Sequence, residues 1–266
     1  MTRIGDMAIG LIGGSGLYEI EGLSISKEIS LSTPYGPASS TFKIGTIDGM
    51  DVIFLPRHGI PHSIPPHKVN YRANIWGFKA LGVEKIIAVN ATGGINRDMA
   101  PGSLVIQDQI IDLTSGRLHT YYDAEKVVHV DFTHPYCPSM RDLCISAAGD
   151  TGLPILSDAT YICVNGPRLE TAAEIRLFSQ MGADIVGMTA MPEAVLAREL
   201  EICLLGISAV TNFAAGIVDK KLTATEVIDS MRNSNGLIKR LLKALIPRIP
   251  ETRSCPCKDA LKDAGL

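Results

Sequence analysis

The chain has 266 residues, of which 46% are hydrophobic and 20% are charged, and its 25 basic and 28 acidic side chains leave a formal net charge of −3. This composition provides enough apolar side chains for a hydrophobic core and excludes a chain that is disordered throughout. The slight negative charge argues against a nucleic-acid-binding protein, because phosphate backbones attract basic faces. No apolar run approaches the roughly 18 residues of a membrane span, and the N-terminal segment lacks the apolar core of a secretory signal, so we expect a cytoplasmic protein.

Strand and helix patterns alternate along the first half of the chain. An apolar run at 8–12 predicts a buried strand that ends in a glycine turn at 13–16. The runs at 41–47 and 51–55 predict a hairpin, and the spacing at 71–81 is typical of a helix. A β-branched run at 85–89 then ends in small and polar residues at 90–94.

The second half continues this alternation. Strands are predicted at 104–111, 159–164, 185–188 and 202–211, and helices at 171–181, 192–200 and 223–245. Thr223 and Glu226 resemble a capping box at the start of the last helix, and Pro247 lies just past its end. Because no repeat or linker interrupts the chain, we expect one α/β domain over residues 1–266, with a mostly buried sheet and a tail at about 250–266.

Glycine-rich turns can bind anions at strand ends. The Gly13-Gly14-Ser15-Gly16 turn is not a dinucleotide fingerprint, which needs a glycine at the position of Glu19, and no P-loop lysine follows it. Its backbone N–H groups and the Ser15 hydroxyl can converge on an anion. The structural alternative is a turn that only reverses the chain.

Three further strand ends carry hydrogen-bond donors. Arg57 and His58 follow the strand at 51–55, Asn90 follows the strand at 85–89, and Thr189 follows the strand at 185–188. An arginine can hold an oxyanion through two parallel hydrogen bonds, although Arg57 alone is equally compatible with a solvated surface cation. Together these groups describe a phosphate site without lysine or metal, which indicates free phosphate as a substrate.

Seven segments carry a resemblance to a known family. They are GLIGGSG at 10–16, RHG at 57–59, VNYRANI at 69–75, NATGG at 90–94, NGPRLE at 165–170, IVGMT at 185–189 and PE at 192–193. Their order and spacing resemble the trimeric purine nucleoside phosphorylase and methylthioadenosine phosphorylase family over nearly the whole chain. The resemblance implies a single-domain, three-layer α/β nucleoside phosphorylase fold with a central mixed β-sheet flanked by helices, assembled as a homotrimer or a dimer of trimers.

The resemblance also implies phosphorolysis, in which phosphate replaces the base of a purine nucleoside and yields free purine and ribose 1-phosphate. Its partners would be the nucleoside and inorganic phosphate, with no nucleic acid, membrane, metal or organic cofactor. A bound phosphate would act both as nucleophile and as electrostatic stabiliser of the ribosyl cation.

By position, several residues match the family's phosphate and ribose ligands. The phosphate ligands implied by the resemblance are Ser15, Arg57, His58, Asn90, Ala91 and Thr189, with Ala91 contributing only its backbone N–H. Met188 matches the residue packed against the ribose, and Tyr71 matches a tyrosine on the 3′ side. Without its neighbours, Met188 would be an ordinary core residue.

Two positions determine which purine the family accepts. Glu170, next to Leu169 in the same pocket, matches the glutamate that accepts a hydrogen bond from N1–H of a 6-oxopurine, and Asn212 matches the asparagine that binds O6 and N7. With His58, we expect these two to be the catalytic residues. Glu170 would oppose the unprotonated N1 of adenine at a cost of about 1–3 kcal/mol. Its structural alternative is a cap on the helix at 171–181.

The 5′ pocket implied by the resemblance is apolar. Ala224, Val227 and Ile228 stand where 6-oxopurine enzymes usually place a histidine, and His129 matches a residue from the neighbouring subunit. Because an apolar wall suits a 5′-methylthio group, we expect a methylthioinosine or other 6-oxopurine nucleoside phosphorylase. The alternatives are a methylthioadenosine phosphorylase that releases adenine, a nucleosidase that uses water, and a non-catalytic purine-binding protein.

The six cysteines do not form a disulfide scaffold in a chain of this length. Cys163 and Cys203 lie in apolar runs and are expected to be small buried hydrophobic residues. The pair Cys255 and Cys257 is too closely spaced for an ordinary zinc knuckle, so it either closes a small disulfide or stays reduced. The pair resembles the tail of archaeal thermophilic family members, where a similar pair can be oxidised. We therefore expect no metal site.

Overall fold

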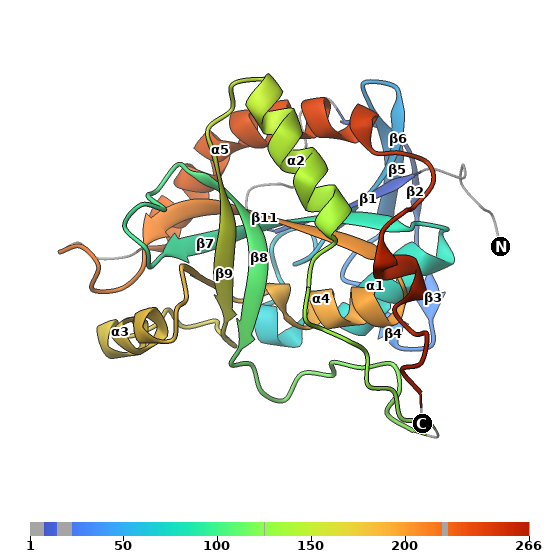
Figure 1. Ribbon diagram of the computed structural model, residues 1–266, viewed down its shortest axis with the longest axis horizontal. Coiled ribbons are helices and arrows are strands. Elements are labelled where there is room, and N and C mark those ends of the chain that lie inside the picture. The colour runs from blue at the N-terminus through green and yellow to red at the C-terminus, as the bar shows by residue number, and fades with distance from the viewer. Residues whose placement is uncertain (1–7, 15–22, 125, 220–222, 266) are drawn as a thin grey trace.

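The computed structural model describes residues 8–14, 23–124, 126–219 and 223–265, with only the backbone described at 224–227. Within these residues nine strands form one mixed sheet in the order β10-β9-β8-β11-β7-β1-β6-β5-β2 (Figure 1). The strands are β1 (Ile9–Gly13), β2 (Leu23–Ile29), β5 (Phe42–Ile47), β6 (Met50–Pro56), β7 (Lys85–Gly94), β8 (Leu104–Asp112), β9 (Ile155–Cys163), β10 (Ile185–Gly187) and β11 (Cys203–Phe213). A separate small ribbon pairs β3 (Ser32–Thr33) with β4 (Gly36–Pro37).

Helices cover both faces of the sheet. They are α1 (Tyr71–Ala80), α2 (Pro138–Asp150), α3 (Ala172–Gln180), α4 (Ala190–Glu199) and α5 (Ala224–Leu245), with 3₁₀ turns at Pro66–Lys68, Ile246–Arg248 and Pro256–Asp259. Helices α1 and α4 pack together on one face, and α2 and α5 pack together on the other. The predicted three-layer α/β fold with a central mixed sheet is therefore confirmed.

The centre of the sheet consists of the parallel strands β6, β1, β7 and β11. Successive side chains of a strand point to opposite faces. Accordingly, Ile12 and Ile86 belong to the core beneath α1 and α4, whereas Leu11 and Ile87 belong to the core beneath α2 and α5. Parallel strands covered on both faces are typically apolar throughout, which explains why these strands appear in the sequence as continuous apolar runs.

Most predicted elements are present with shifted ends. The largest shift is in β7, which was expected to stop at Val89 but continues through Gly94, because β11 pairs along its whole length and β10 pairs with Gly93 and Gly94. Strand β2 and helix α2 were not predicted. Strand β2 lies at the edge of the sheet and is mostly exposed, and its short alternation of apolar and polar residues is interrupted at Lys27, where the register with β5 shifts.

A capping box occurs at the start of α3. The Thr171 hydroxyl accepts the Glu174 N–H at 3.1 Å, and the Glu174 carboxylate accepts the Thr171 N–H at 2.7 Å. The cap is therefore Thr171, which removes helix capping as the explanation of Glu170. The capping box predicted at Thr223 depends on Glu226, whose side chain is outside the described part of the chain.

Among the described residues, no helix combines the length and the apolar character that a membrane crossing requires.

Candidate active site

A cavity of about 1020 Å³ opens at the carboxyl ends of the central strands. Parallel strands bring their carboxyl ends to the same edge of a sheet, where ligands of α/β proteins usually bind. Nine of the residues predicted from the sequence line it: Arg57, His58, Ala91, Leu169, Glu170, Met188, Thr189, Asn212 and Ile228. By their predicted roles, Arg57, His58 and Thr189 are here called the phosphate end of the cavity, and Glu170 and Asn212 the base end.

Arg57 is buried, with 1% of its surface exposed, so it is not a surface cation. Its Nε and Nη2 donate to the two carboxylate oxygens of Glu193, and Nη1 donates to the Val89 carbonyl at 3.0 Å. Burial alone would lower the pKa of Arg57, but the Glu193 carboxylate raises it above the usual value. The two parallel bonds that we expected phosphate to receive are thus made with Glu193.

Part of the Arg57 guanidinium still faces the cavity. Arginine has five N–H donors, and three of them are engaged as described. A Cβ atom at Gly14 would lie 3.1 Å from Nη1 of Arg57, so the glycine leaves an open approach to this nitrogen. An anion at the phosphate end would therefore receive single N–H groups rather than the whole guanidinium fork.

His58 is held in its neutral form. Its Nδ1 lies 2.8 Å from the Ile64 carbonyl, which can only accept, so Nδ1 carries the proton. Burial, reinforced by the positive charge of Arg57, lowers the pKa of His58 to about 3. The imidazole also stacks on His62 with ring centroids 4.3 Å apart. Its remaining nitrogen, Nε2, therefore presents a lone pair and can accept a hydrogen bond from a donor in the cavity.

Asn90 orients Thr189 and does not itself line the cavity. Its amide nitrogen donates to the Thr189 hydroxyl at 2.7 Å, and its amide oxygen accepts from Gln107 at 3.1 Å. A threonine hydroxyl has one proton. Because the Thr189 oxygen accepts from Asn90, that proton can be donated either to the neighbouring Tyr161 hydroxyl or to an anion in the cavity.

The base end combines a carboxylate with an amide. Burial raises the pKa of the half-buried Glu170 carboxyl. Asn212 follows a bulge in β11, which re-aims the side chains at the end of the strand. Its amide oxygen accepts from the Thr211 hydroxyl at 2.8 Å, and its amide nitrogen donates one N–H to the Phe213 carbonyl at 2.8 Å. The second N–H of Asn212 is the donor that a purine can use.

The chain belongs to the phosphorylase superfamily. A sequence profile of that superfamily matches residues 8–247. The chain is 54% identical over 260 residues to a probable S-methyl-5′-thioinosine phosphorylase of Thermodesulfovibrio yellowstonii, covering 97% of each chain. It is 51% identical to the 6-oxopurine nucleoside phosphorylase of Pyrococcus furiosus, covering 96% of this chain and 98% of the relative. A crystal structure of a methylthioadenosine phosphorylase from an antarctic soil metagenomic library has a TM-score of 0.91 and 35% identity, covering 98% of this chain and 93% of that one.

Some predicted site residues of this phosphorylase-superfamily chain lie elsewhere or outside the described residues. Tyr71 does not line the cavity, since its buried hydroxyl donates to the Pro66 carbonyl at 2.8 Å. His129 is exposed, and its backbone N–H donates to the Ala264 carbonyl at 2.8 Å. Ser15 and the side chains of Ala224 and Val227 fall outside the described residues. Their roles stay predictions.

Sequence reasoning gave no role to Glu193 or Arg117. Arg117 donates to the carbonyls of Met188 at 2.8 Å and Asn165 at 3.0 Å, and its guanidinium lies over the Tyr71 ring. It thereby ties together two segments that line the cavity. Arg117 lies in an irregular stretch without periodicity, so no sequence signal could have identified this role. Glu193 lies in one of the segments that carry the family resemblance. Only its contact with Arg57 shows that it holds the Arg57 guanidinium in place.

Proposed function

We propose that this chain catalyses phosphorolysis of 6-oxopurine nucleosides, with S-methyl-5′-thioinosine, inosine and guanosine as substrates. The products are the free base and the corresponding ribose or methylthioribose 1-phosphate. The observation that carries the proposal is that Glu170 and Asn212 line the same cavity as the donors of the phosphate end. Membership of the phosphorylase superfamily supports the reaction class.

In the proposed reaction, hydrogen phosphate lies between Arg57, His58 and Thr189. The C1′–N9 bond breaks and its electron pair moves into the purine, while an electron pair from a phosphate oxygen forms the new C1′–O bond. The proton carried by hydrogen phosphate ends on the released purine, so charge and atoms balance. The negative phosphate also stabilises the positive charge that develops on the ribosyl group.

The base end assists departure of the purine. Negative charge collects on N7 and O6 as the bond breaks, and the second N–H of Asn212 can donate to these atoms. Removal of a donor of this kind commonly lowers the rate by about 10²–10³. Glu170 accepts a hydrogen bond from N1–H, a group that 6-oxopurines have and adenine lacks.

The second candidate is a methylthioadenosine phosphorylase, favoured by the methylthioadenosine phosphorylase structure of similar fold. The raised pKa of Glu170 bears on this choice, because a protonated carboxyl can donate to N1 of adenine whereas a carboxylate cannot. The 6-oxopurine assignment therefore requires Glu170 to be ionised at the working pH.

A panel of methylthioinosine, methylthioadenosine, inosine, guanosine and adenosine, each with and without phosphate, tests the proposal. We expect phosphate-dependent release of base from the three 6-oxopurine nucleosides, with kcat/KM well above that for the two adenine nucleosides. Equal turnover of methylthioadenosine and methylthioinosine would overturn the base assignment. Turnover without phosphate would identify a nucleosidase, and no turnover at all would leave a binding protein.

A further inference from the structure

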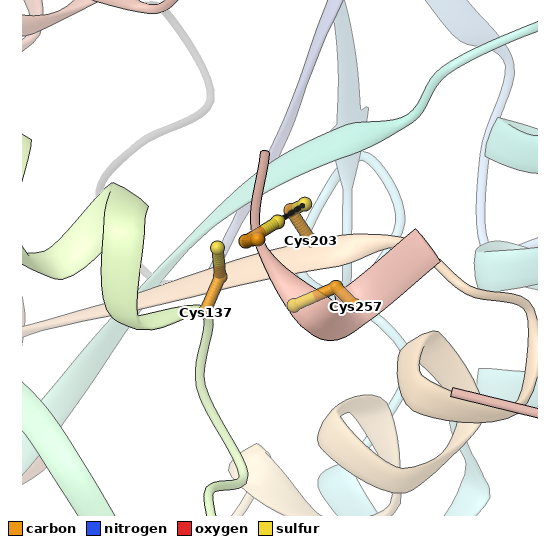
Figure 2. Close-up of side chains that lie close together, drawn as sticks. Cys137, Cys203 and Cys257 are labelled. Atoms are coloured by element: carbon orange, nitrogen blue, oxygen red, sulfur yellow. Dashed lines mark hydrogen bonds between the residues drawn. The ribbon is translucent and has the colours of Figure 1, made fainter. Parts of the chain in front are cut away.

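Four cysteines that are distant in the sequence meet in one buried cluster. Cys137 immediately precedes α2, Cys203 is the first residue of β11, and Cys257 belongs to the C-terminal tail (Figure 2). Cys255 belongs to the same tail. All four are free thiols and are buried. The fold therefore places the thiols of Cys137 and Cys203 beside the closely spaced pair at the C-terminal end. Four possible metal ligands are present instead of two.

The four sulfur atoms have the spacing of a tetrahedral thiolate site. All of them lie within 4.8 Å of one another, and the Sγ atoms of Cys203 and Cys255 are 3.2 Å apart. A tetrahedral zinc ion with Zn–S bonds of about 2.3 Å requires sulfur atoms about 3.8 Å apart. This value lies between the distance of that pair and the 4.8 Å upper bound, so the four sulfur atoms are close to the spacing of such a site.

The surroundings of the cluster favour negative charge on sulfur. The buried Arg198 guanidinium lies 3.7 Å from Cys257 Sγ, and its other terminal nitrogen donates to the His134 carbonyl. A buried cation beside sulfur is what a negatively charged metal–thiolate centre needs, because an unpaired buried charge is costly.

We propose that Cys137, Cys203, Cys255 and Cys257 bind one zinc ion. Four thiols release four protons to solvent on binding Zn²⁺ and form a centre with net charge −2, which Arg198 partly offsets. Soft thiolate ligands in tetrahedral geometry select zinc over the hard cations that prefer oxygen. No electron is transferred, in contrast to disulfide formation from the same thiols.

The proposed ion is structural and takes no part in the reaction. None of the four cysteines lines the cavity. Cys203 and Asn212 stand near opposite ends of β11, and nine residues of strand correspond to about 30 Å at the usual rise. The ion would join the tail to the start of β11 and of α2, and the tail is already attached nearby by the Lys85 ammonium, which donates to the Glu251 carbonyl at 2.9 Å.

Metal analysis of the whole chain, purified without oxygen and under reducing conditions, tests the proposal. We expect one zinc ion per chain, and the zinc-free reduced protein should bind Co²⁺ at the same stoichiometry with thiolate-to-metal charge-transfer absorption. Native mass spectrometry should detect the chain plus zinc minus the displaced protons. Zinc should also raise the unfolding temperature of the protein from which it was removed.

Matched variants separate this site from adventitious binding. Cys257→Ser should weaken Co²⁺ binding at least tenfold and shift the absorption. Cys144→Ser removes a buried thiol of α2 that is not part of the cluster, so this variant should bind Co²⁺ as wild type does. Arg198→Met should lower metal affinity by about 10–100-fold, as loss of a supporting group commonly does.

Three results would overturn the proposal. One is a reduced wild-type chain that binds no Co²⁺ with thiolate absorption, a measurement that does not depend on whether any variant folds. Another is a chain from reducing purification that is lighter by two or four hydrogens and holds no metal, which means disulfides. The third is equal loss of binding in Cys144→Ser and Cys257→Ser.

Discussion

His58 shows how one hydrogen bond fixes the role of a side chain. The Ile64 carbonyl can only accept, so it places the single proton of the imidazole on Nδ1 and leaves Nε2 as an acceptor. A phosphate ligand would then have to supply the hydrogen in this contact. The neighbouring Arg57 maintains the neutral form, since its charge and the burial of the ring both disfavour an imidazolium.

The lowered pKa of His58 predicts how stability depends on pH. An unfolded histidine titrates near 6.5, so between about pH 6.5 and 3 the unfolded chain binds a proton that the folded chain does not. The stabilising contribution is thus fully present above about pH 6.5 and is lost as the pH falls toward 3. In phosphate-free buffer, the free energy of unfolding of wild type should fall between pH 7 and pH 5 by about 2 kcal/mol more than that of His58→Gln. Parallel slopes for the two proteins would contradict the assigned pKa.

The Arg57–Glu193 pair predicts an unusual pattern of stability. Arg57→Ala leaves a buried carboxylate without its partner, and breaking a buried pair typically costs about 3–5 kcal/mol. The double variant Arg57→Ala/Glu193→Ala should be more stable than Arg57→Ala alone, as measured by urea unfolding.

In steady-state assays, Arg57→Ala should raise the KM for phosphate far more than the KM for nucleoside. A change confined to the nucleoside KM would show that Arg57 does not contact phosphate.

At the scale of elements, the bulge in β11 and the turn before α3 together form the base end. Asn212 comes from the strand and Glu170 from the turn, and the capping box of Thr171 and Glu174 fixes where that helix begins. Gly93 allows the close approach of the strands here, because a Cβ atom at this position would lie 3.3 Å from the amide nitrogen of Asn212. Base selectivity therefore depends on how three backbone segments meet.

Replacement of Asn212 and Glu170 should shift the preference of the site from 6-oxopurines toward adenine. Asn212→Asp places an acceptor opposite O6, which is itself an acceptor, and suits a 6-amino group instead. Glu170→Ser removes the carboxylate that opposes the unprotonated N1 of adenine. A site built on hydrogen bonds can reject the mismatched ligand by about 10⁴–10⁵, so the kcat/KM ratio of methylthioinosine to methylthioadenosine should be large in wild type and fall most in the double variant. An unchanged ratio in the double variant would refute the roles of both residues.

The sequence was informative where burial and periodicity agree, and less so where the fold joins distant segments. The apolar runs of β1 and β11 were recognised because both faces of these strands are covered. Helix α2 was missed although its buried residues Met140, Cys144 and Ala147 have helical spacing, because small side chains give a weak apolar pattern. The contact of Arg57 with Glu193 joins residues 136 positions apart, and no local pattern encodes such a pairing.

At the scale of the whole molecule, His129 is not among the residues that line the cavity of its own chain, and the resemblance assigns it to a neighbour's site. In this chain His129 is exposed on the segment that pairs with the C-terminal end, where Val128 and Gly265 form an isolated β-bridge. The orientation of this segment therefore depends on residues at the end of the chain.

We predict an assembly of at least a trimer in which His129 acts in trans. His129→Ala should raise the KM for nucleoside and leave the KM for phosphate nearly unchanged. Co-expression of His129→Ala with Asn212→Ala should restore part of the wild-type kcat/KM, since some mixed sites combine an intact Asn212 with a neighbour's intact His129. Sedimentation velocity gives the assembly state in the same samples, and a fully active monomer would exclude the shared site.

The pairing of Arg57 with Glu193 also bears on the ionic environment in which the protein can work. The pair has no net charge, His58 is neutral, and Arg232, which also lines the cavity, has Asp229 3.4 Å from its guanidinium. With a chain charge of −3, the described groups provide little long-range attraction for a dianion. Salt at 1 M shortens the Debye length to about 3 Å, yet contacts formed by N–H and O–H dipoles at hydrogen-bond distance survive such screening. Phosphate saturation should therefore change little between dilute buffer and concentrated potassium chloride, so the site should keep its affinity for phosphate over a wide range of ionic strength.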